Sequence, residues 1–380
     1  MPRADLVVVG AGPAGLSVAI FARQAGLSVI VLDRARPPID RGCGEGLLPD
    51  AVAQLAALGA EPGAGARAPF LGIRYLAEGL TAEGRFPGGP AWGVRRTVLH
   101  STLARRAAEA GADLRWGAEP GGLAPDGVEV DAGVLEAAMV VGADGRHSAV
   151  RRWAGLEGRP GRPGRHGVRR HFEVEPWADV VEVHWAHQAE AYVTPVGPRQ
   201  VGVALLWNGG PSRFDELLHR FPALAARLTR ALQVSRDRGA SRFGARPRAV
   251  VAGRVALVGD AAGGVDPITG EGLSLALRGA AALVTAIVAG DLAGYARAHR
   301  RLVRGPRLMA RTLLLMESSV RLRHNAIAAL HDDPALFSRL LAFHSGALPA
   351  RAVGLWPVAR LLARSLAATP PPLPGAFHAA

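Results

Sequence analysis

The sequence contains a single cysteine, Cys43, and no lysine among its 380 residues. One thiol excludes an internal disulfide and a zinc site built from several cysteines, and it suits a reducing cytoplasm. The absence of lysine excludes mechanisms that need a Schiff base or a lysine-bound oxidant. No apolar run reaches the about 20 residues of a transmembrane helix, and no secretory leader is visible at the start. We therefore expect a cytoplasmic protein.

All 45 basic residues are arginine, and they give a formal net charge of +13. The sequence also has 48 glycines and 28 prolines, which together with abundant alanine indicate the codon usage of a GC-rich genome. We therefore expect no nucleic-acid partner in spite of the charge. At 49% hydrophobic and 20% charged residues, the chain is long and apolar enough to bury a large core.

The first motif is the stretch DLVVVGAGPAGLSVAIFARQAGLSVIVLDR near the start of the chain. Residues 6–9 and 28–32 are typical of buried parallel strands, and the glycine-rich turn between them opens a helix. Such a turn lets the backbone approach a pyrophosphate, which the helix N-terminus stabilises, while an acid after the second strand binds a ribose. The motif predicts a dinucleotide site formed by Gly10, Gly12, Pro13, Ala14, Gly15 and Asp33.

Two later stretches of the sequence distinguish FAD from NAD as the bound dinucleotide. RVALVGDAAGGVDPITGEGLSLALRG contains a strand, a Gly-Asp pair and a helix that begins near Gly272, and AAMVVGADGRHSAVRRWAGL contains an Asp-Gly pair. With the first motif, these stretches resemble the fingerprints of FAD-dependent oxidoreductases of the group A monooxygenase, or aromatic hydroxylase, type. The geranylgeranyl reductase branch is a close relative of that group, and the resemblance covers about Asp5 to Arg300.

The resemblance implies non-covalent FAD, with NAD(P)H as a transient reductant and no metal. Asp260 would bind the ribityl chain, and the start of the helix near Gly272 would lie against the flavin ring. Arg96 begins an Arg-x-x-Leu-x-x-x-Leu pattern that would lie near the phosphates or ribityl chain; the alternative is a solvated helix arginine. The further cofactor residues that the resemblance implies are Arg34, Arg41, Asp144, Gly259, Gly270 and Leu273.

The stretch RGCGEGLLP places Cys43 between two glycines and resembles the Cys-Gly loop of the geranylgeranyl reductase branch. In that family the loop lies beside the flavin ring, where glycines let the backbone approach a flat surface. Cys43 has no second thiol as a redox partner, so we interpret it as a wall of the substrate pocket. Glu45 is a candidate for catalysis, although a structural ion pair with Arg41 or another arginine is at least as good an interpretation.

The middle of the chain alternates between apolar and polar residues over 168–208, which predicts antiparallel strands that roof the substrate pocket. Tyr192 and Thr194 share one face, and we expect both to point toward the flavin. The alternative for Tyr192 is a core tyrosine capped by a backbone carbonyl. His184 is a further catalytic candidate. The reductases carry Tyr-x-Trp-x-Phe-Pro here, but the Trp and Phe are missing, and the Trp motif and active-site lysine of flavin halogenases are absent too.

The fold expected is α/β, with a Rossmann-like FAD-binding domain interleaved with an antiparallel-sheet (α+β) substrate domain and followed by C-terminal helices. Residues 306–324 form an amphipathic pattern with arginine on its polar side; we expect it to pack on the core, and weak contact with a membrane surface is the alternative. The expected segments are 1–75, 101–160 and 246–300 for FAD binding, 76–100 as a cofactor-contact insert, 161–245 for the substrate sheet, 301–368 as helices and 369–380 as a tail.

The sequence therefore predicts an FAD-dependent monooxygenase that uses NAD(P)H and oxygen to hydroxylate or epoxidise an apolar or aromatic small molecule, a reaction typical of specialised metabolism. Two alternatives remain open. One is a flavin-dependent double-bond reductase of the geranylgeranyl reductase type. The other is a catalytically silent flavin-binding protein.

Overall fold

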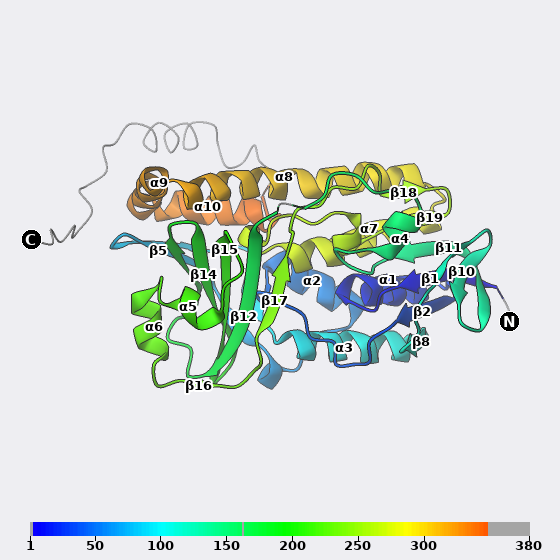
Figure 1. Cartoon of the computed structure of the whole chain (residues 1–380), viewed down its shortest axis with the longest axis horizontal. Coiled ribbons are helices and arrows are strands. Elements are labelled where there is room, and N and C mark those ends of the chain that lie inside the picture. The colour runs from blue at the N-terminus through cyan, green and yellow to red at the C-terminus, as the bar shows by residue number, and fades with distance from the viewer. Residues whose placement is uncertain (1–2, 162, 349–380) are drawn as a thin grey trace, which may run out of the picture.

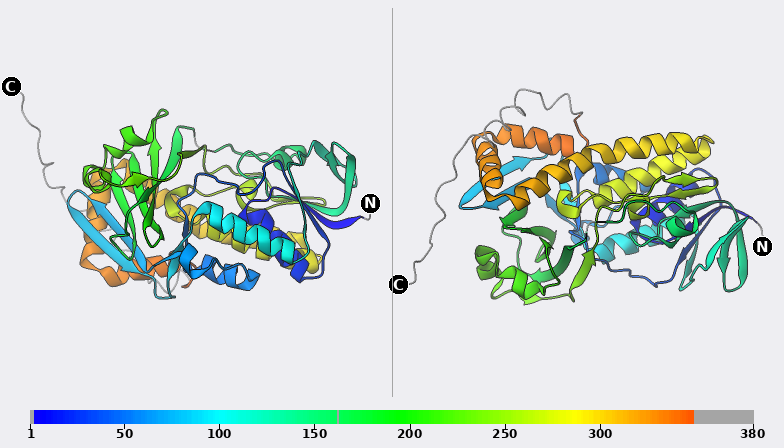
Figure 2. Two further views of the ribbon diagram at one scale, coloured as in Figure 1. Left: turned by 90° about the horizontal axis from the view of Figure 1, so that it is seen from below. Right: turned by 45° about the horizontal axis from the view of Figure 1, so that its top comes forward.

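The structure, a computed structural model, describes residues 3–161 and 163–348. Two large sheets lie at opposite ends of an elongated molecule, and long helices run along it (Figure 1). This arrangement confirms the expected α/β class with a second, largely antiparallel sheet and C-terminal helices. The views in Figure 2 show the orange C-terminal helices beside the second sheet.

The first sheet is built around β1, whose buried run Leu6–Val9 is typical of a strand covered on both faces. β1 pairs in parallel with β2 on one side and with β11 on the other. Helix α1 packs on β1 and β2 and contacts α3 and α7. In sheet order the strands are β18 (Val251–Ala252), β19 (Val255–Leu257), β11 (Gly133–Gly142), β1 (Ala4–Val9), β2 (Val29–Asp33) and β8 (Asp113–Trp116), with β9 (Gly122–Ala124) and β10 (Gly127–Val130) extending from β11.

The second sheet is antiparallel except for one parallel pair, β5 with β13. Its strands alternate between the two faces, as the period-two pattern predicts. In order they are β16 (Leu232–Gln233), β12 (Arg165–Glu173), β15 (Gln200–Asn208), β14 (Ala189–Gly197), β13 (Val181–Ala186), β5 (Gly72–Ala77) and β6 (Leu80–Arg85), and β17 (Arg238–Ser241) also pairs with β12. The boundary expected at residue 75 therefore falls inside β5, which belongs to this sheet together with β6.

A small sheet of β3 (Gly46–Leu47), β7 (Ala91–Gly93) and β4 (Ala68–Phe70) lies between the large ones. A Cβ at Gly93 would lie 1.6 Å from the carbonyl oxygen of Pro195, so only glycine lets β7 approach β14 this closely. The contact brings the Cys43 loop, which leads into β3, close to the second sheet.

The helices cover both sheets. α9 and α10 pack on β6, and α8 packs on α7. The helices are α1 (Pro13–Gln24), α2 (Pro49–Leu58), α3 (Arg96–Glu109), α4 (Ala149–Trp153), α5 (Phe214–Leu218), α6 (Pro222–Leu228), α7 (Gly272–Val288), α8 (Leu292–Ser318), α9 (Val320–Asp332) and α10 (Pro334–His344), with short 3-10 turns η1 (Ala64–Ala66), η2 (Gly259–Ala262) and η3 (Pro267–Thr269). The helix expected beyond residue 348 and the tail at 369–380 lie outside the described residues.

Candidate functional site

A cavity of about 1500 Å³ lies between the two large sheets and extends along α8, α9 and α10. Single-ligand pockets usually measure about 300–1,000 Å³, so this cavity has room for more than one small molecule. At one end it is lined by the glycine-rich loops of the first sheet. At the other end, where the second sheet and the C-terminal helices line it, the lining is apolar and includes Leu313, Leu330, Phe337 and Leu341.

The glycine-rich turn after β1 has the geometry expected of a dinucleotide site. Gly10 has φ +104°, and a Cβ there would lie 2.5 Å from the carbonyl oxygen of Ala143. A Cβ at Gly15 would lie 1.9 Å from the Gly10 carbonyl oxygen, which explains the close approach of α1 to the strand. Asp33 Oδ2 accepts a hydrogen bond of 2.8 Å from the Ala11 N–H, so this carboxylate also fixes the turn.

Gly12 and Arg96 supply the clearest test of whether a cofactor fits. A Cβ at Gly12 would meet only Arg96 Nη2, at 4.0 Å, so the space in front of this turn is open. Arg96 is 8% exposed, and its Nη1 has no hydrogen-bond partner among the described residues. Burial also lowers the pKa of its guanidinium. A buried N–H donor without an acceptor is costly, and an anionic or hydroxyl-rich ligand in the open space would satisfy Nη1, so the residues present fit a dinucleotide.

The strand β19 brings a second loop to the same end of the cavity. Gly259 has φ +61°, and a Cβ there would lie 2.7 Å from the Cβ of Ala14, so the two loops pack directly. Asp260 follows and is exposed to the cavity. Gly270, in the left-handed conformation, and Gly272 lead into α7, and added Cβ atoms there would meet nothing within 4 Å. The N-terminus of α7 therefore presents its positive dipole end to open space.

Asp144 lines the cavity, but its carboxylate is already engaged. It accepts hydrogen bonds from the Ser148 hydroxyl at 2.5 Å and from the Ala149 N–H at 2.6 Å, at the start of α4. Arg151 of α4 then donates from Nη1 to the Ala261 carbonyl at 3.1 Å, which links this loop to the Asp260 loop. The geometry favours a structural role for Asp144. Arg34, Arg41, Pro13 and Leu273 also line the cavity.

Glu45 occupies an unusual position beside the cavity. It has φ +63° and is 1% exposed. Its Oε1 accepts a hydrogen bond of 2.7 Å from the Arg96 N–H, and its Oε2 lies 2.5 Å from His171 Nε2. Arg169 Nη1, which can only donate, lies 3.0 Å from His171 Nδ1. His171 therefore carries its proton on Nε2 and donates it to Glu45, so this carboxylate ties the Cys43 loop to α3 and to β12.

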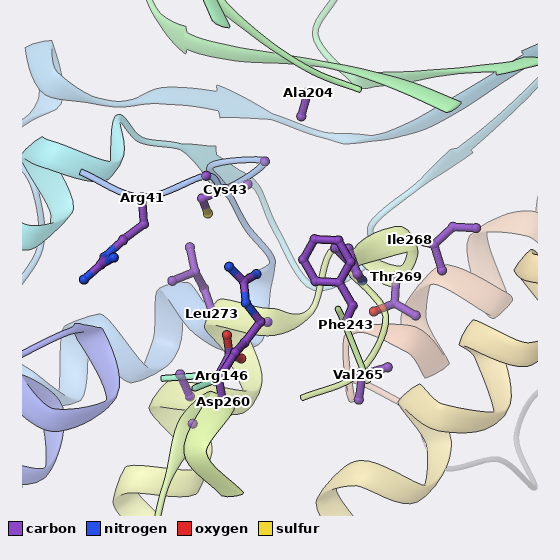
Figure 3. Close-up of a pocket in the computed structure, with 18 of the residues that line it drawn as sticks. Arg41, Cys43, Arg146, Ala204, Phe243, Asp260, Val265, Ile268, Thr269 and Leu273 are labelled. Atoms are coloured by element: carbon purple, nitrogen blue, oxygen red, sulfur yellow. The ribbon is translucent and has the colours of Figure 1, made fainter. Parts of the chain in front are cut away.

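Cys43 faces the cavity in Figure 3, where its sulfur points toward Leu273. Its Sγ accepts a contact of 3.3 Å from the Glu45 N–H, and burial raises the pKa of the thiol. The nucleophilic thiolate is therefore scarce at neutral pH. This environment supports the interpretation of Cys43 as a wall of the pocket.

Cys43→Ser is expected to retain FAD and to keep turnover within about tenfold of the wild type, because the hydroxyl replaces a small inert wall group. Absorbance of the purified protein and NAD(P)H oxidation measure the two properties. As a check on the thiol itself, wild-type Cys43 should react with a disulfide reagent more slowly than in urea-unfolded protein. Complete loss of turnover with flavin still bound would show that the thiol takes part in catalysis.

Tyr192 and Thr194 both line the cavity, as their shared strand face predicts. The Tyr192 hydroxyl, however, donates a hydrogen bond of 2.7 Å to the Ile268 carbonyl. The phenol is therefore already used by a backbone group, and only its ring is offered to a ligand. His184 is not among the cavity-lining residues; it follows Val183 and so points to the opposite face, where its Nε2 lies 3.2 Å from Glu182 Oε2.

Tyr192→Phe is expected to lower the free energy of unfolding by about 1 kcal/mol, because the Ile268 carbonyl loses its donor. Flavin content and the affinity for an apolar ligand such as dodecylphenol should change less than about threefold, since the ring remains. Urea unfolding and a flavin spectral titration make the comparison. A large loss of ligand affinity at unchanged stability would instead assign the hydroxyl to the ligand.

Several cavity-lining residues were not predicted from the sequence. Arg146 lies over the ring of Phe243, 5.0 Å from its centroid, and both side chains line the cavity (Figure 3). The apolar lining from α8, α9 and α10 was also missed, because an amphipathic pattern predicts a buried face but not its neighbours. His171, the hydrogen-bond partner of Glu45, was also not predicted. The only sign of it in the sequence is that it lies two residues from Arg169 and so on the same face of β12.

A buried charge cluster lies next to the Asp266 loop. Arg165 of β12 is fully buried and pairs with Glu190 of β14, with Glu317 of α8 at 2.7 Å, and with Asp266 at 3.4 Å. Burial raises the pKa of Glu190 well above its usual range. The cluster joins the second sheet, α8 and the loop before η3, so it holds one wall of the cavity in place.

Glu271 immediately precedes α7, is 3% exposed, and its Oε2 lies 3.5 Å from His344 Nδ1. Burial, together with the nearby Asp50, raises the pKa of Glu271 to about 8. Burial also lowers the pKa of His344 to about 4, and its Nε2 lies 2.7 Å from the Thr269 carbonyl. Glu271 is therefore protonated, and His344 neutral, at neutral pH.

This pair predicts a pH dependence of stability. Between the ordinary carboxyl pKa and about pH 8, folded protein keeps the Glu271 proton and unfolded chain releases it, so the free energy of unfolding falls as pH rises. Glu271→Gln should remove this slope, and from pH 6 to pH 8 the wild type should lose about 2 kcal/mol more than the variant. Urea unfolding at both pH values tests it, with exposed Glu216→Gln as control. Parallel slopes would contradict the assignment.

The sequence is similar to those of known flavin-binding proteins and oxidoreductases. Residues 3–300 match the family model described as FAD binding domain. A menaquinone reductase of Mycolicibacterium smegmatis is 30% identical over 329 residues, 78% of this chain and 79% of the relative. A 3-amino-4-hydroxybenzoate 2-monooxygenase of Streptomyces cremeus is 28% identical over 322 residues, 73% of this chain and 77% of the relative.

Solved structures share the fold. A flavoprotein/dehydrogenase from Cytophaga hutchinsonii superimposes with a TM-score of 0.78 at 20% identity, over 91% of this chain and 93% of that one. A probable FAD-dependent monooxygenase from Pseudomonas aeruginosa superimposes with a TM-score of 0.68 at 19% identity, over 90% of this chain and 99% of that one.

Proposed function

Because the chain belongs to the FAD binding domain family and is an FAD-dependent oxidoreductase, we propose that it uses NAD(P)H and oxygen to hydroxylate or epoxidise an aromatic substrate bearing an extended apolar chain. The observation that carries the proposal is the cavity, which joins the dinucleotide loops to a long apolar chamber. A ring would bind beside the Cys43 loop, and its apolar chain would lie among the side chains of α8, α9 and α10.

The wall opposite the Cys43 loop supports a ring-shaped head group. Thr194 stands where the reductase motif carries Trp, and Ala204 pairs with Tyr192 on the next strand. Both small side chains line the cavity, and Figure 3 shows Ala204 above Cys43. Small residues here leave space for a planar group between the second sheet and the dinucleotide end.

Bound FAD, once reduced by NAD(P)H, supplies the electrons with which one oxygen atom enters the substrate and the other leaves as water. The protein binds and orients both molecules. Gly12, Arg96 and Asp260 would hold the cofactor, and the N-terminus of α7 would stabilise negative charge on the reduced ring. The apolar lining excludes water, which protects the reaction from wasteful peroxide release.

Reduction of a double bond is the second candidate, and the identity to menaquinone reductases favours it. The same cavity would accommodate an isoprenoid chain, with no oxygen consumed. The Cys-Gly loop at residues 43–44 also resembles that branch. The two reactions differ in their demand for oxygen and in the mass of the product.

Holoenzyme should be incubated with NADPH or NADH and with dodecylphenol or a prenylated naphthoquinone, in air and under argon. We expect dodecylphenol to stimulate oxygen uptake and to gain one oxygen atom by mass spectrometry. Anaerobic gain of two hydrogen atoms that the prenylated naphthoquinone keeps after reoxidation in air, and that therefore lie in its chain and not in a quinol, would support the reductase instead. If no probe stimulated NAD(P)H oxidation, both reactions would be contradicted for these substrate classes.

A further inference from the structure

The apolar part of the cavity reaches the surface along α8. Leu308 and Leu315 line the cavity, yet they are 62% and 59% exposed, respectively. They lie seven residues apart, two helical turns, and so share one face of the helix. Exposed leucines that also line a cavity mark its opening, and this opening is rimmed by apolar side chains.

The same helix face carries a dense positive charge. Arg301, Arg304 and Arg311 are exposed, and none has an ion-pair partner among the described residues. Glu317, the one acid within α8, is 1% exposed and is paired with Arg165. With no exposed acid on α8, its surface attracts anions. We call Arg301, Arg304, Leu308, Arg311 and Leu315 the α8 patch.

Repulsion between arginines in and beside the α8 patch also favours binding of an anion there. Arg307 is half-buried, and burial together with Arg246 and Arg311 lowers the pKa of its guanidinium. Binding of a helix to a membrane interface grows with the apolar area it buries and with its electrostatic attraction to anionic lipids, and exposed leucines flanked by arginines supply both.

We propose that the α8 patch docks on a bilayer containing anionic lipids, so that the cavity opens toward the acyl chains. The arginines would pair with lipid phosphates, and Leu308 and Leu315 would enter the apolar region below them. Among the described residues, no helix has the length and hydropathy of a membrane span. Figure 1 shows α8 along one edge of the molecule.

A second copy of the chain is a poorer occupant of the patch. A two-fold interface would place the patch against itself and bring like-charged arginines together. Lipid phosphates instead complement every arginine of the patch. Only the purpose of the contact, delivery of a substrate with an apolar chain, rests on the proposed function; the contact itself rests on the α8 patch.

The test is cosedimentation of FAD-loaded full-length protein with vesicles, without substrate. We expect binding to vesicles of phosphatidylcholine with an equal amount of phosphatidylglycerol, weaker binding at high salt, and little binding to phosphatidylcholine alone. Leu308→Ser with Leu315→Ser should weaken binding at least about tenfold, since two buried apolar contacts are lost. Arg304→Gln with Arg311→Gln should weaken binding to the anionic vesicles by about tenfold or more.

Leu232→Ser with Val134→Ser is the matched control, because these side chains are 64% and 46% exposed on other elements. Its binding should stay within about twofold of the wild type. Flavin absorbance and thermal unfolding verify that every variant is folded. Absence of wild-type binding, or unchanged binding of both patch variants, would overturn the proposal. A patch variant that binds vesicles normally but changes the oligomeric mass measured by light scattering would also overturn it, because the patch would then contact a second copy of the chain. Vesicle binding without turnover of any probe would contradict the proposed function alone.

Discussion

Arg165→Met is expected to lower the free energy of unfolding by about 3–5 kcal/mol, because removing one member of a buried charge cluster leaves its partners uncompensated. Glu190, Glu317 and Asp266 all contact this guanidinium and are 5% exposed or less. One orphaned carboxylate can escape part of the cost by binding a proton. The loss should therefore grow as pH rises, and urea unfolding at two pH values measures it.

Arg170→Met provides the control on the same strand. Arg170 also pairs with two carboxylates, Asp215 and Asp237, but their side chains are 69% and 37% exposed. Exposed pairs contribute little, so we expect a loss of about 1 kcal/mol or less. Adding Glu190→Gln to Arg165→Met should recover part of the stability. Equal losses in the two single variants would show that burial does not govern the cluster.

Gly12→Val is expected to give folded protein that has lost its FAD. Gly12 has φ −72°, which valine tolerates, and a Cβ meets no atom closer than 4.0 Å. The branched side chain would fill the space in front of Arg96 and of the α1 N-terminus. Losing two charge-assisted hydrogen bonds to phosphate should weaken FAD binding at least about a hundredfold. Flavin content after gel filtration, and circular dichroism of the same sample, test the two parts.

Substitutions at two other glycines serve as controls for Gly12→Val. Gly63→Val makes the same change where nothing lies within 4 Å, outside the cavity, and should leave FAD bound. Gly15→Ala would place its Cβ 1.9 Å from the Gly10 carbonyl oxygen and should cost stability as well as cofactor. Normal flavin content in Gly12→Val would place the cofactor elsewhere.

The dinucleotide end could be predicted because its information is local. Each of its loops follows a buried strand and precedes a helix, so position and spacing are visible in a few tens of residues. The role of Asp144 was less accessible, since its carboxylate caps α4 within the same short loop. A fingerprint indicates where a residue lies, but the hydrogen-bond partners decide what it does.

The substrate end was predicted only in part. Alternation correctly placed Tyr192 and Thr194 on one face of the strand. The same rule would have excluded His184 from the cavity, because it is adjacent to the cavity-lining Val183 and so points to the opposite face. The distal chamber needs α9 and α10 to pack beside β6, an element more than 200 residues earlier in the chain, and α8 to pack beside η3. No local pattern specifies such a pairing, because every amphipathic helix in the chain offers a similar apolar face.

The interleaving of the two sheets has a consequence for synthesis. β5 pairs with β13, which places Ile73 beside Val181, more than 100 residues later in the chain. β11 likewise stays unpaired on one side until β19, at Val255–Leu257, has been synthesised. Asp260 and the start of α7 follow later still. A chain emerging from the ribosome at about 5–20 residues per second therefore exposes unpaired strand edges for many seconds before it can hold its flavin. Cofactor uptake is expected to be a late event, and the nascent chain a client for chaperones that cover bare strands.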